Sequence, residues 1–142
     1  MAFRQALKEH AKEGGSAGRL ARYSRNHAEL LAGLEGLGFY PYVPHPVAGS
    51  IITTFLVPDD PNFNFSTMYR ELADRGYVIY PGKTTKADSF RVGSIGQLFE
   101  EDMRGLVGTL KEILLQQGVK LPVTQKGIKV VCGKGLGKTI VH

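Results

Sequence analysis

The 142-residue sequence contains no tryptophan and only one cysteine, Cys132. A single cysteine cannot form a disulfide within the chain, which agrees with a reducing compartment. No apolar run approaches the roughly 20 residues that a membrane-spanning helix needs, and the amino terminus, MAFRQALKEH, lacks the apolar core of a signal peptide. His45 stands between prolines with no partner at metal-ligand spacing. These absences predict a cytoplasmic chain without a metal site.

Acidic residues are absent after Glu112, and this absence makes the end of the chain basic. The 13 basic residues before that point balance the 13 acidic ones, so the net charge of +5 lies in five lysines of the tail: Lys120, Lys126, Lys129, Lys134 and Lys138. The tail has no aromatic residue that could stack on a base, which argues against a nucleic-acid partner. We therefore predict a domain over residues 1–118 and a basic, solvated, partly disordered tail over residues 119–142.

Four segments show apolar residues at helical spacing: residues 2–13, 16–37, 65–75 and 99–117. Ser16 is available to cap the second helix, and Asn64 or Ser66 the third. The second stripe includes Leu20, Tyr23 and His27 on its amino-terminal half. The first helical pattern begins directly after Met1 without a capping residue, as expected where a chain starts inside an element. This start predicts a truncated chain.

Four short segments have the composition of strands: residues 39–44, 51–57, 77–80 and 89–92. The first contains two prolines, which confine it to a sheet edge or a loop. The strands come in pairs between helices, in the order helix, helix, strand, strand, helix, strand, strand, helix. This order predicts an α+β fold with a small, mostly antiparallel sheet covered on one side by helices.

Arg91 lies in the fourth predicted strand, and its neighbours assign it to one face of the sheet. Side chains alternate across a strand, so Phe90 and Val92 should face the core while Ser89 and Arg91 face the other way. The planar guanidinium of an arginine fixed in this way suits a carboxylate or a phosphonate. The alternative is a partly exposed structural arginine paired with a nearby acidic residue. The residues alone leave both interpretations open.

Three further arginines, Arg19, Arg22 and Arg25, share one face of the second predicted helix. They could attract an anionic substrate. The pattern favours the alternative, a solvated face close to the first helix.

Several motifs carry a resemblance to a known family. They are GYVIYPGK at residues 76–83, DSFRVGSIG at residues 88–96, EGG at residues 13–15, and short matches at residues 21–23, 37–39 and 51–53. Together they resemble the carboxyl-terminal domain of 2-aminoethylphosphonate–pyruvate aminotransferases, which are class V members of the fold-type I pyridoxal-phosphate enzymes. The resemblance runs from residue 2 to about residue 115. It implies that Arg91 binds the carboxylate of pyruvate or alanine, with Lys83 and Tyr80 as further candidates for substrate binding.

The resemblance also implies what this chain lacks. Transamination needs a lysine to carry pyridoxal phosphate, an acidic partner for the ring nitrogen and a cup for the phosphate, and the family has all three in a preceding large domain. None of the ten lysines here has the matching context. We therefore expect a domain or fragment that binds no cofactor and is inactive alone. Joined to the absent large domain, it would serve transfer of the amino group of 2-aminoethylphosphonate to pyruvate. The resemblance leaves homodimer formation open.

The sequence is also compatible with two other functions. A related class V enzyme, an alanine–glyoxylate or serine–pyruvate aminotransferase, also has an arginine followed by a hydrophobic residue and glycine. A non-catalytic interaction module could instead use its exposed face and its basic tail to bind an acidic partner.

Overall fold

The computed structural model describes residues 2–43, 48–83, 88–125, 129–133 and 136–141. Within these residues lie four α-helices and five β-strands. The helices are α1 (Ala2–Lys12), α2 (Gly15–Gly36), α3 (Phe65–Asp74) and α4 (Glu100–Gln116). The strands are β1 (Ile52–Leu56), β2 (Tyr80–Lys83), β3 (Asp88–Gly93), β4 (Lys129–Gly133) and β5 (Leu136–Val141). None of the described helices is long and apolar enough to cross a membrane.

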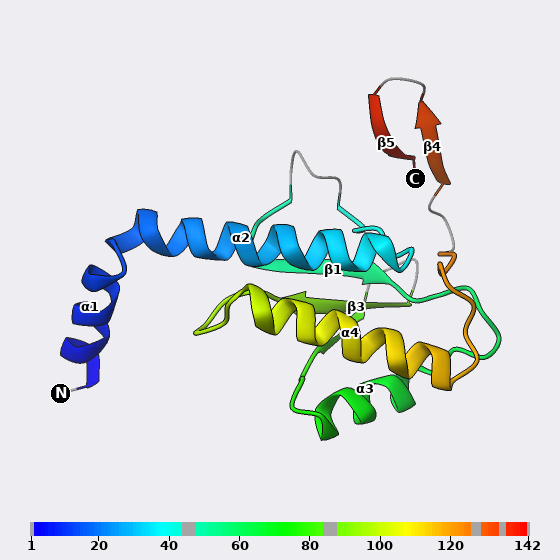
Figure 1. Cartoon of the computed structure of the whole chain (residues 1–142), viewed down its shortest axis with the longest axis horizontal. Helices are drawn as coiled ribbons and strands as arrows, with labels where there is room; N and C mark the ends of the chain where they lie inside the picture. Colours follow the sequence, from blue (N-terminus) through cyan, green and yellow to red (C-terminus); the bar gives the residue numbers. More distant parts are fainter. Residues whose placement is uncertain (1, 44–47, 84–87, 126–128, 134–135, 142) are drawn as a thin grey trace.

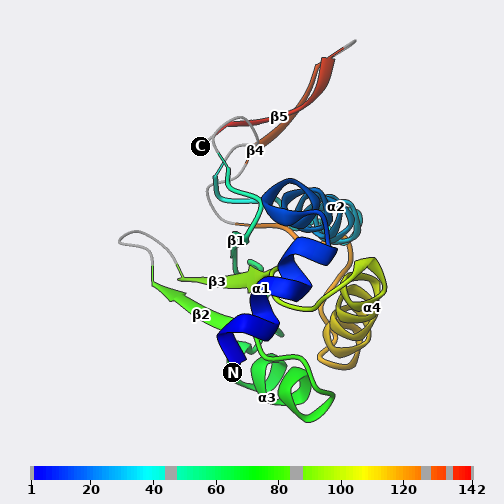
Figure 2. The ribbon, with the colours of Figure 1, turned by 90° about the vertical axis from the view of Figure 1, so that its left-hand side faces the viewer.

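Strands β1, β3 and β2 form one antiparallel sheet with β3 in the centre. Helix α4 packs against both α2 and α3 (Figure 1). Figure 2 shows α2 and α4 together on one side of the sheet. The helices and the antiparallel sheet confirm the predicted α+β class.

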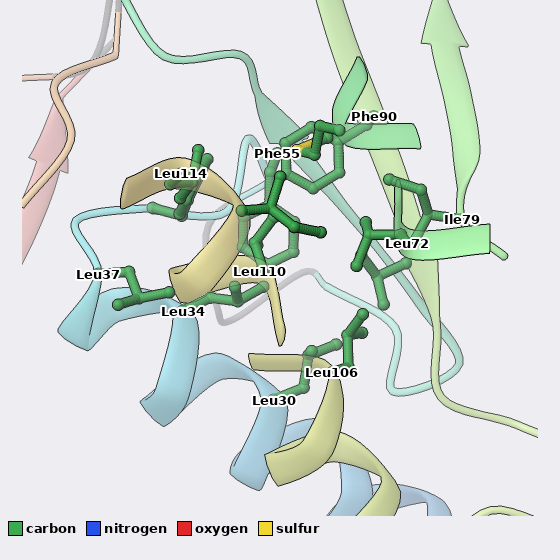
Figure 3. Close-up of a cluster of buried hydrophobic side chains, with 14 of the residues drawn as sticks. Leu30, Leu34, Leu37, Phe55, Leu72, Ile79, Phe90, Leu106, Leu110 and Leu114 are labelled. Atoms are coloured by element: carbon green, nitrogen blue, oxygen red, sulfur yellow. The ribbon is translucent and has the colours of Figure 1, made fainter. Parts of the chain in front are cut away.

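Three phenylalanines form the aromatic centre of the core. The ring centroid of Phe90, on β3, lies 5.7 Å from that of Phe39 in an edge-to-face arrangement and 5.7 Å from that of Phe55 in a stacked one. Both arrangements are favoured for aromatic pairs. Figure 3 shows Phe55 and Phe90 in one buried cluster with leucines of α2 and α4, among them Leu30, Leu34, Leu106 and Leu110. The core therefore lies between the sheet and this helical layer.

The junction between α1 and α2 differs from the expected one. Ser16 lies inside α2, and the N-cap position belongs to Gly14, which has a φ of 97° and no side-chain cap. Glycine adopts this φ without strain, which permits the sharp change of direction between the two helices. Leu20, expected on the buried stripe, is 58% exposed, because the amino-terminal half of α2 extends beyond the sheet (Figure 1).

Two of the four expected strands lie elsewhere than predicted. Residues 39–43, the described part of the first expected strand, form no strand and contribute one isolated bridge, Pro41 to Phe55. Strand β2 begins at Tyr80 rather than at residue 77 and continues through Pro81 and Gly82, which had the composition of a turn. An edge strand tolerates proline because one of its sides needs no donor, and β2 is such an edge.

The chain beyond residue 118 contributes to the folded body. Val119 and Val123 are buried in the core, and the side chain of Gln125 accepts a hydrogen bond from Tyr40 N at 2.8 Å and donates one to Leu56 O at 2.7 Å. The domain boundary stays a prediction, but packing continues seven residues past it, over 119–125. Strands β4 and β5 pair as a separate two-stranded sheet, where a solvated extension was expected.

Candidate substrate-anion site

Arg91 occupies the middle of the central strand, on the face of the sheet opposite the core. The strand register pairs it with Thr54 of β1 on one side and with Tyr80 of β2 on the other. Directly paired residues place their side chains on the same face, about 5 Å apart. The three residues therefore form one row across the sheet, which brings together two of the predicted site residues, Arg91 and Tyr80.

The guanidinium of Arg91 is exposed, and its described contact is weak. Its Nη2 donates to Pro81 O at 3.4 Å, close to the limit for a hydrogen bond. The ion pairs among the described residues do not include Arg91. Among the described residues, Arg91 is therefore not the arginine paired with an acidic side chain that the sequence left as an alternative.

The sheet surface next to Arg91 is open on one side. Gly93 lies two residues further along the same face of β3, and a Cβ added there would meet its nearest atom, Ile51 O, only at 3.9 Å. Exposed apolar side chains border this surface, with Tyr80 at 58% and Ile52 at 44% exposure. A bare glycine floor, a cationic group and an apolar border together suit a small organic anion.

Ser89 and Lys83 lie close to Arg91 in the sheet. Ser89, expected to be on the exposed face with Arg91, is buried, because its Oγ fills the space above Gly82, where an added Cβ would lie 2.4 Å away. Lys83 belongs to β2, but its side chain lies outside the described part of the structure. Its role as a substrate residue stays a prediction.

Arg22 corrects the prediction of a solvated arginine face on α2. It is only 8% exposed. Its Nε donates to Glu13 Oε1 at 2.6 Å, and its Nη1 donates to Gly96 O at 2.6 Å and to Leu98 O at 2.9 Å. Arg19 also binds Glu13, at 2.8 Å. The hydrogen bond from Arg22, reinforced by Arg19, lowers the pKa of Glu13 from 4.5 to about 2.

Two cavities lined by described residues lack the lysine that pyridoxal phosphate requires. A cavity of about 860 Å³ lies between α1, α2 and residues 96–99, and its wall includes Glu13, Arg19, Arg22, Tyr23 and Phe99. A second, of about 190 Å³, lies between β3, α4 and residues 76–79. Neither cavity is lined by a lysine that could carry the cofactor.

The fold is similar to one part of aminotransferases of known structure. It superimposes on ureidoglycine–glyoxylate aminotransferase from Bacillus subtilis with a TM-score of 0.75 and 20% identity, over 89% of this chain and 32% of that one. It superimposes on alanine–glyoxylate aminotransferase from Nostoc with a TM-score of 0.72 and 27% identity, over 80% of this chain and 30% of that one. At 20% identity, the similarity to the Bacillus subtilis enzyme indicates a shared fold and nothing about function. No family model matches the sequence.

Among aminotransferases, the chain is similar in sequence to enzymes that act on one amino donor. The chain is 50% identical over 117 residues to the 2-aminoethylphosphonate–pyruvate transaminase of Syntrophobacter fumaroxidans, and 44% identical over 110 residues to that of Klebsiella pneumoniae. These matches cover 82% and 78% of this chain but 32% and 30% of the relatives. The chain is thus homologous to part of a 2-aminoethylphosphonate–pyruvate transaminase, as its motifs indicated. It spans about a third of the length of these curated relatives.

Proposed function

We propose that this chain is the substrate-anion domain of a 2-aminoethylphosphonate–pyruvate transaminase, in which Arg91 binds the carboxylate of pyruvate or alanine. The complete enzyme would convert 2-aminoethylphosphonate and pyruvate to phosphonoacetaldehyde and alanine. The observation that carries the proposal is the exposed guanidinium of Arg91 at the centre of an open sheet face, with a weak described contact to Pro81 O.

The chemistry of the site is binding and orientation. A guanidinium can donate two parallel hydrogen bonds to one carboxylate, which fixes the plane of the carboxylate as well as its position. The keto carbon of a three-carbon substrate is then held in a constant direction relative to the sheet. Arg91 thus acts in positioning and transfers no proton. Tyr80 lies beside it in the same row, where its ring bounds the substrate and its hydroxyl supplies a further donor.

In this proposal, the amino-transfer step is carried out by a part of the complete enzyme that this chain does not include. Pyridoxal phosphate supplies the electron sink for such a reaction, and neither cavity described above offers it a lysine. We expect the remaining two-thirds of the relatives' length to hold this cofactor, so the 142-residue chain alone would be inactive.

The open sheet face is also the surface on which we expect that large domain to pack. Ile52 and Tyr80, paired with Gly93 and Arg91 of β3, are 44% and 58% exposed, and neighbouring exposed apolar side chains mark an interaction surface more often than a solvated one. Packing there would enclose a substrate bound to Arg91. A homodimer and a cytoplasmic location complete the proposal, on the analogy of the family.

A second candidate is an aminotransferase of glyoxylate, favoured by the superposition on the Nostoc alanine–glyoxylate aminotransferase. The higher identity to the phosphonate enzymes, 50% against 27%, favours the first candidate. Formation of phosphonoacetaldehyde from 2-aminoethylphosphonate, or of glycine from glyoxylate, by the complete enzyme separates the two.

An amide-resolved NMR titration of this chain with pyruvate tests the role of Arg91. We expect concentration-dependent shifts on β3 and at Tyr80, and none with acetone, which has the keto group without the carboxylate. Arg91→Lys should weaken binding at least tenfold, because one ammonium replaces a bidentate fork. Arg70→Lys, at an exposed arginine of α3, is the matched control. Equal affinity of the Arg91→Lys chain and the unaltered chain would refute the proposal.

A further inference from the structure

Two buried side chains of α2 hold the segment that leaves the Arg91 strand. Arg22 and Asn26 are one helical turn apart, so they point to the same side of the helix. Arg22 donates to Gly96 O and Leu98 O. Asn26 Nδ2 donates to Leu98 O at 2.8 Å and to Ser94 O at 3.3 Å. Residues 94–98, which directly follow β3, are therefore fixed to α2 through three of their carbonyl groups.

The same segment is joined to the residues that precede β1. Ser94 N donates to Ile51 O at 3.1 Å, and Ser94 Oγ donates to Ser50 O at 2.9 Å. Strand β1 begins one residue after Ile51 and carries Thr54, while β3 ends one residue before Ser94 and carries Arg91. The contacts of Asn26 and Arg22 thus fix a junction from which β1 and β3, two of the three strands of the row, extend.

This network of buried polar groups stabilises the fold inefficiently. Burying a guanidinium removes it from water, its partners only partly compensate for the lost solvation, and an apolar pair of the same volume is often as stable. Arg22 needs Glu13 to balance its charge, and the rings of Tyr23 and Phe99 lie 5.1 Å and 5.3 Å from it. Hydrogen-bond donors fix the position of each carbonyl group that they bind, whereas apolar contacts do not.

We infer that Arg22 and Asn26 are positioning residues for the anion site of Arg91. The inference rests on the function proposed above. Without these donors, residues 94–98 would settle differently against α2. The end of β3, which lies two residues beyond Arg91, would then be displaced. A displacement of this kind changes the direction of a guanidinium, and binding through a bidentate fork is sensitive to direction. Arg22 and Asn26 themselves touch no substrate in this scheme.

The variants Arg22→Lys and Asn26→Ser test the inference. The lysine keeps the charge beside Glu13 but loses the three directed donors, and the serine is too short to reach both carbonyl groups. We expect each to weaken pyruvate binding about 3- to 10-fold in the same NMR titration, equivalent to one lost hydrogen bond. Asn26→Ser carries the test alone if Arg22→Lys loses its signal dispersion.

Two control variants separate positioning from stability. Gly33→Ala should destabilise the packing of α2 on α4, since an added Cβ would lie 2.7 Å from Val107 Cγ2. Arg104→Lys alters an arginine that pairs with Glu29 and Glu101 and makes no described contact with residues 94–98. Measured well below the unfolding midpoint, both controls should bind pyruvate as the unaltered chain does.

The outcomes distinguish the inference from the function on which it rests. Unchanged affinity in Arg22→Lys and Asn26→Ser, with weakened binding in Arg91→Lys, overturns the positioning role and leaves the proposed function standing. Unchanged affinity in Arg91→Lys, or no shift with the unaltered chain, overturns both. An equal loss of affinity in Gly33→Ala would show that general destabilisation, and not the position of residues 94–98, weakens the site.

Discussion

Glu13 and Arg22 form a close ion pair, 2.6 Å from Oε1 to Nε, between the end of α1 and the first turns of α2. Arg22 extends this contact to the carbonyl groups of Gly96 and Leu98. One carboxylate therefore balances the charge that joins three parts of the chain: α1, α2 and the segment after β3.

The ion pair predicts a loss of stability in acid. The pKa of Glu13 is lowered from 4.5 to about 2 in the folded chain, so folding favours its charged form. The stabilisation is complete above pH 4.5 and is lost as the pH falls from there toward 2. Unfolding midpoints in urea between pH 2 and pH 6 measure it.

The Glu13→Gln chain is the control for this pH dependence. Asp60 and Glu100 also have a lowered pKa, through hydrogen bonds from backbone amides and, for Glu100, from Arg25. Both chains should therefore lose stability in acid, but the unaltered chain should lose more. Identical curves for the two chains would contradict the assignment.

Helices α2 and α4 pack closely at Gly33 and Val107. A Cβ at Gly33 would lie 2.7 Å from Val107 Cγ2 and 3.0 Å from Cγ1. We expect Gly33→Ala to lower the free energy of unfolding by about 1–3 kcal/mol, the usual cost of overpacking a core. Gly36→Ala, where an added Cβ meets nothing within 4 Å, should be neutral or stabilising by up to about 1 kcal/mol.

A double variant tests the cause of the Gly33 effect. Combining Gly33→Ala with Val107→Ala removes both methyl groups in the way, so the two changes should be strongly non-additive. Simple addition of their effects in urea unfolding would mean that the helices do not touch at this point.

Local patterns were sufficient to predict the helices. Asn64 was one of two candidate caps of α3, and its side chain accepts from Thr67 N at 2.9 Å. The apolar spacing of residues 99–117 likewise placed α4, with its acidic residues in the first turn. Such features depend on residues three or four apart, which the sequence shows side by side.

Features that depend on residues far apart in the sequence could not be predicted from local patterns. Arg22 is buried because carbonyl groups 74 and 76 residues later accept its hydrogen bonds. Pro81 and Gly82 have the composition of a turn, and only pairing with Phe90 and Ser89 makes them a strand. The position of Arg91 was predicted correctly because alternation between Phe90 and Val92 is a local signal. Its function stays a prediction.

The end of the folded body predicts a sharp difference between two truncations. Removing residues 126–142 deletes the pair β4 and β5, which form their own sheet, and should leave the unfolding midpoint unchanged. Removing residues 119–142 also deletes the buried Val119 and Val123 and should cost several kcal/mol, about 1.5–3 for each buried valine. Thermal unfolding of the two truncated chains measures this. Equal midpoints would place the boundary at residue 118, as first predicted.

Gly93 is expected to matter for binding and not for folding. It faces the same side of the sheet as Arg91, and an added Cβ there meets no atom closer than 3.9 Å. Gly93→Val should therefore leave the free energy of unfolding within about 0.5 kcal/mol, since valine suits an exposed strand. Its two methyl groups would stand where a ligand of Arg91 rests on the sheet, so pyruvate binding should fall at least tenfold.

Gly49→Ala is the matched control, because a Cβ at Gly49 also meets nothing within 4 Å and lies before β1, away from the row. It should alter neither stability nor affinity. If Gly93→Val binds pyruvate as tightly as the unaltered chain, the ligand of Arg91 does not lie over the glycine floor. The guanidinium would then have to bind its anion toward β2 and Tyr80, because the other end of the row's face is filled by the buried side chains of Ser89 and Leu56.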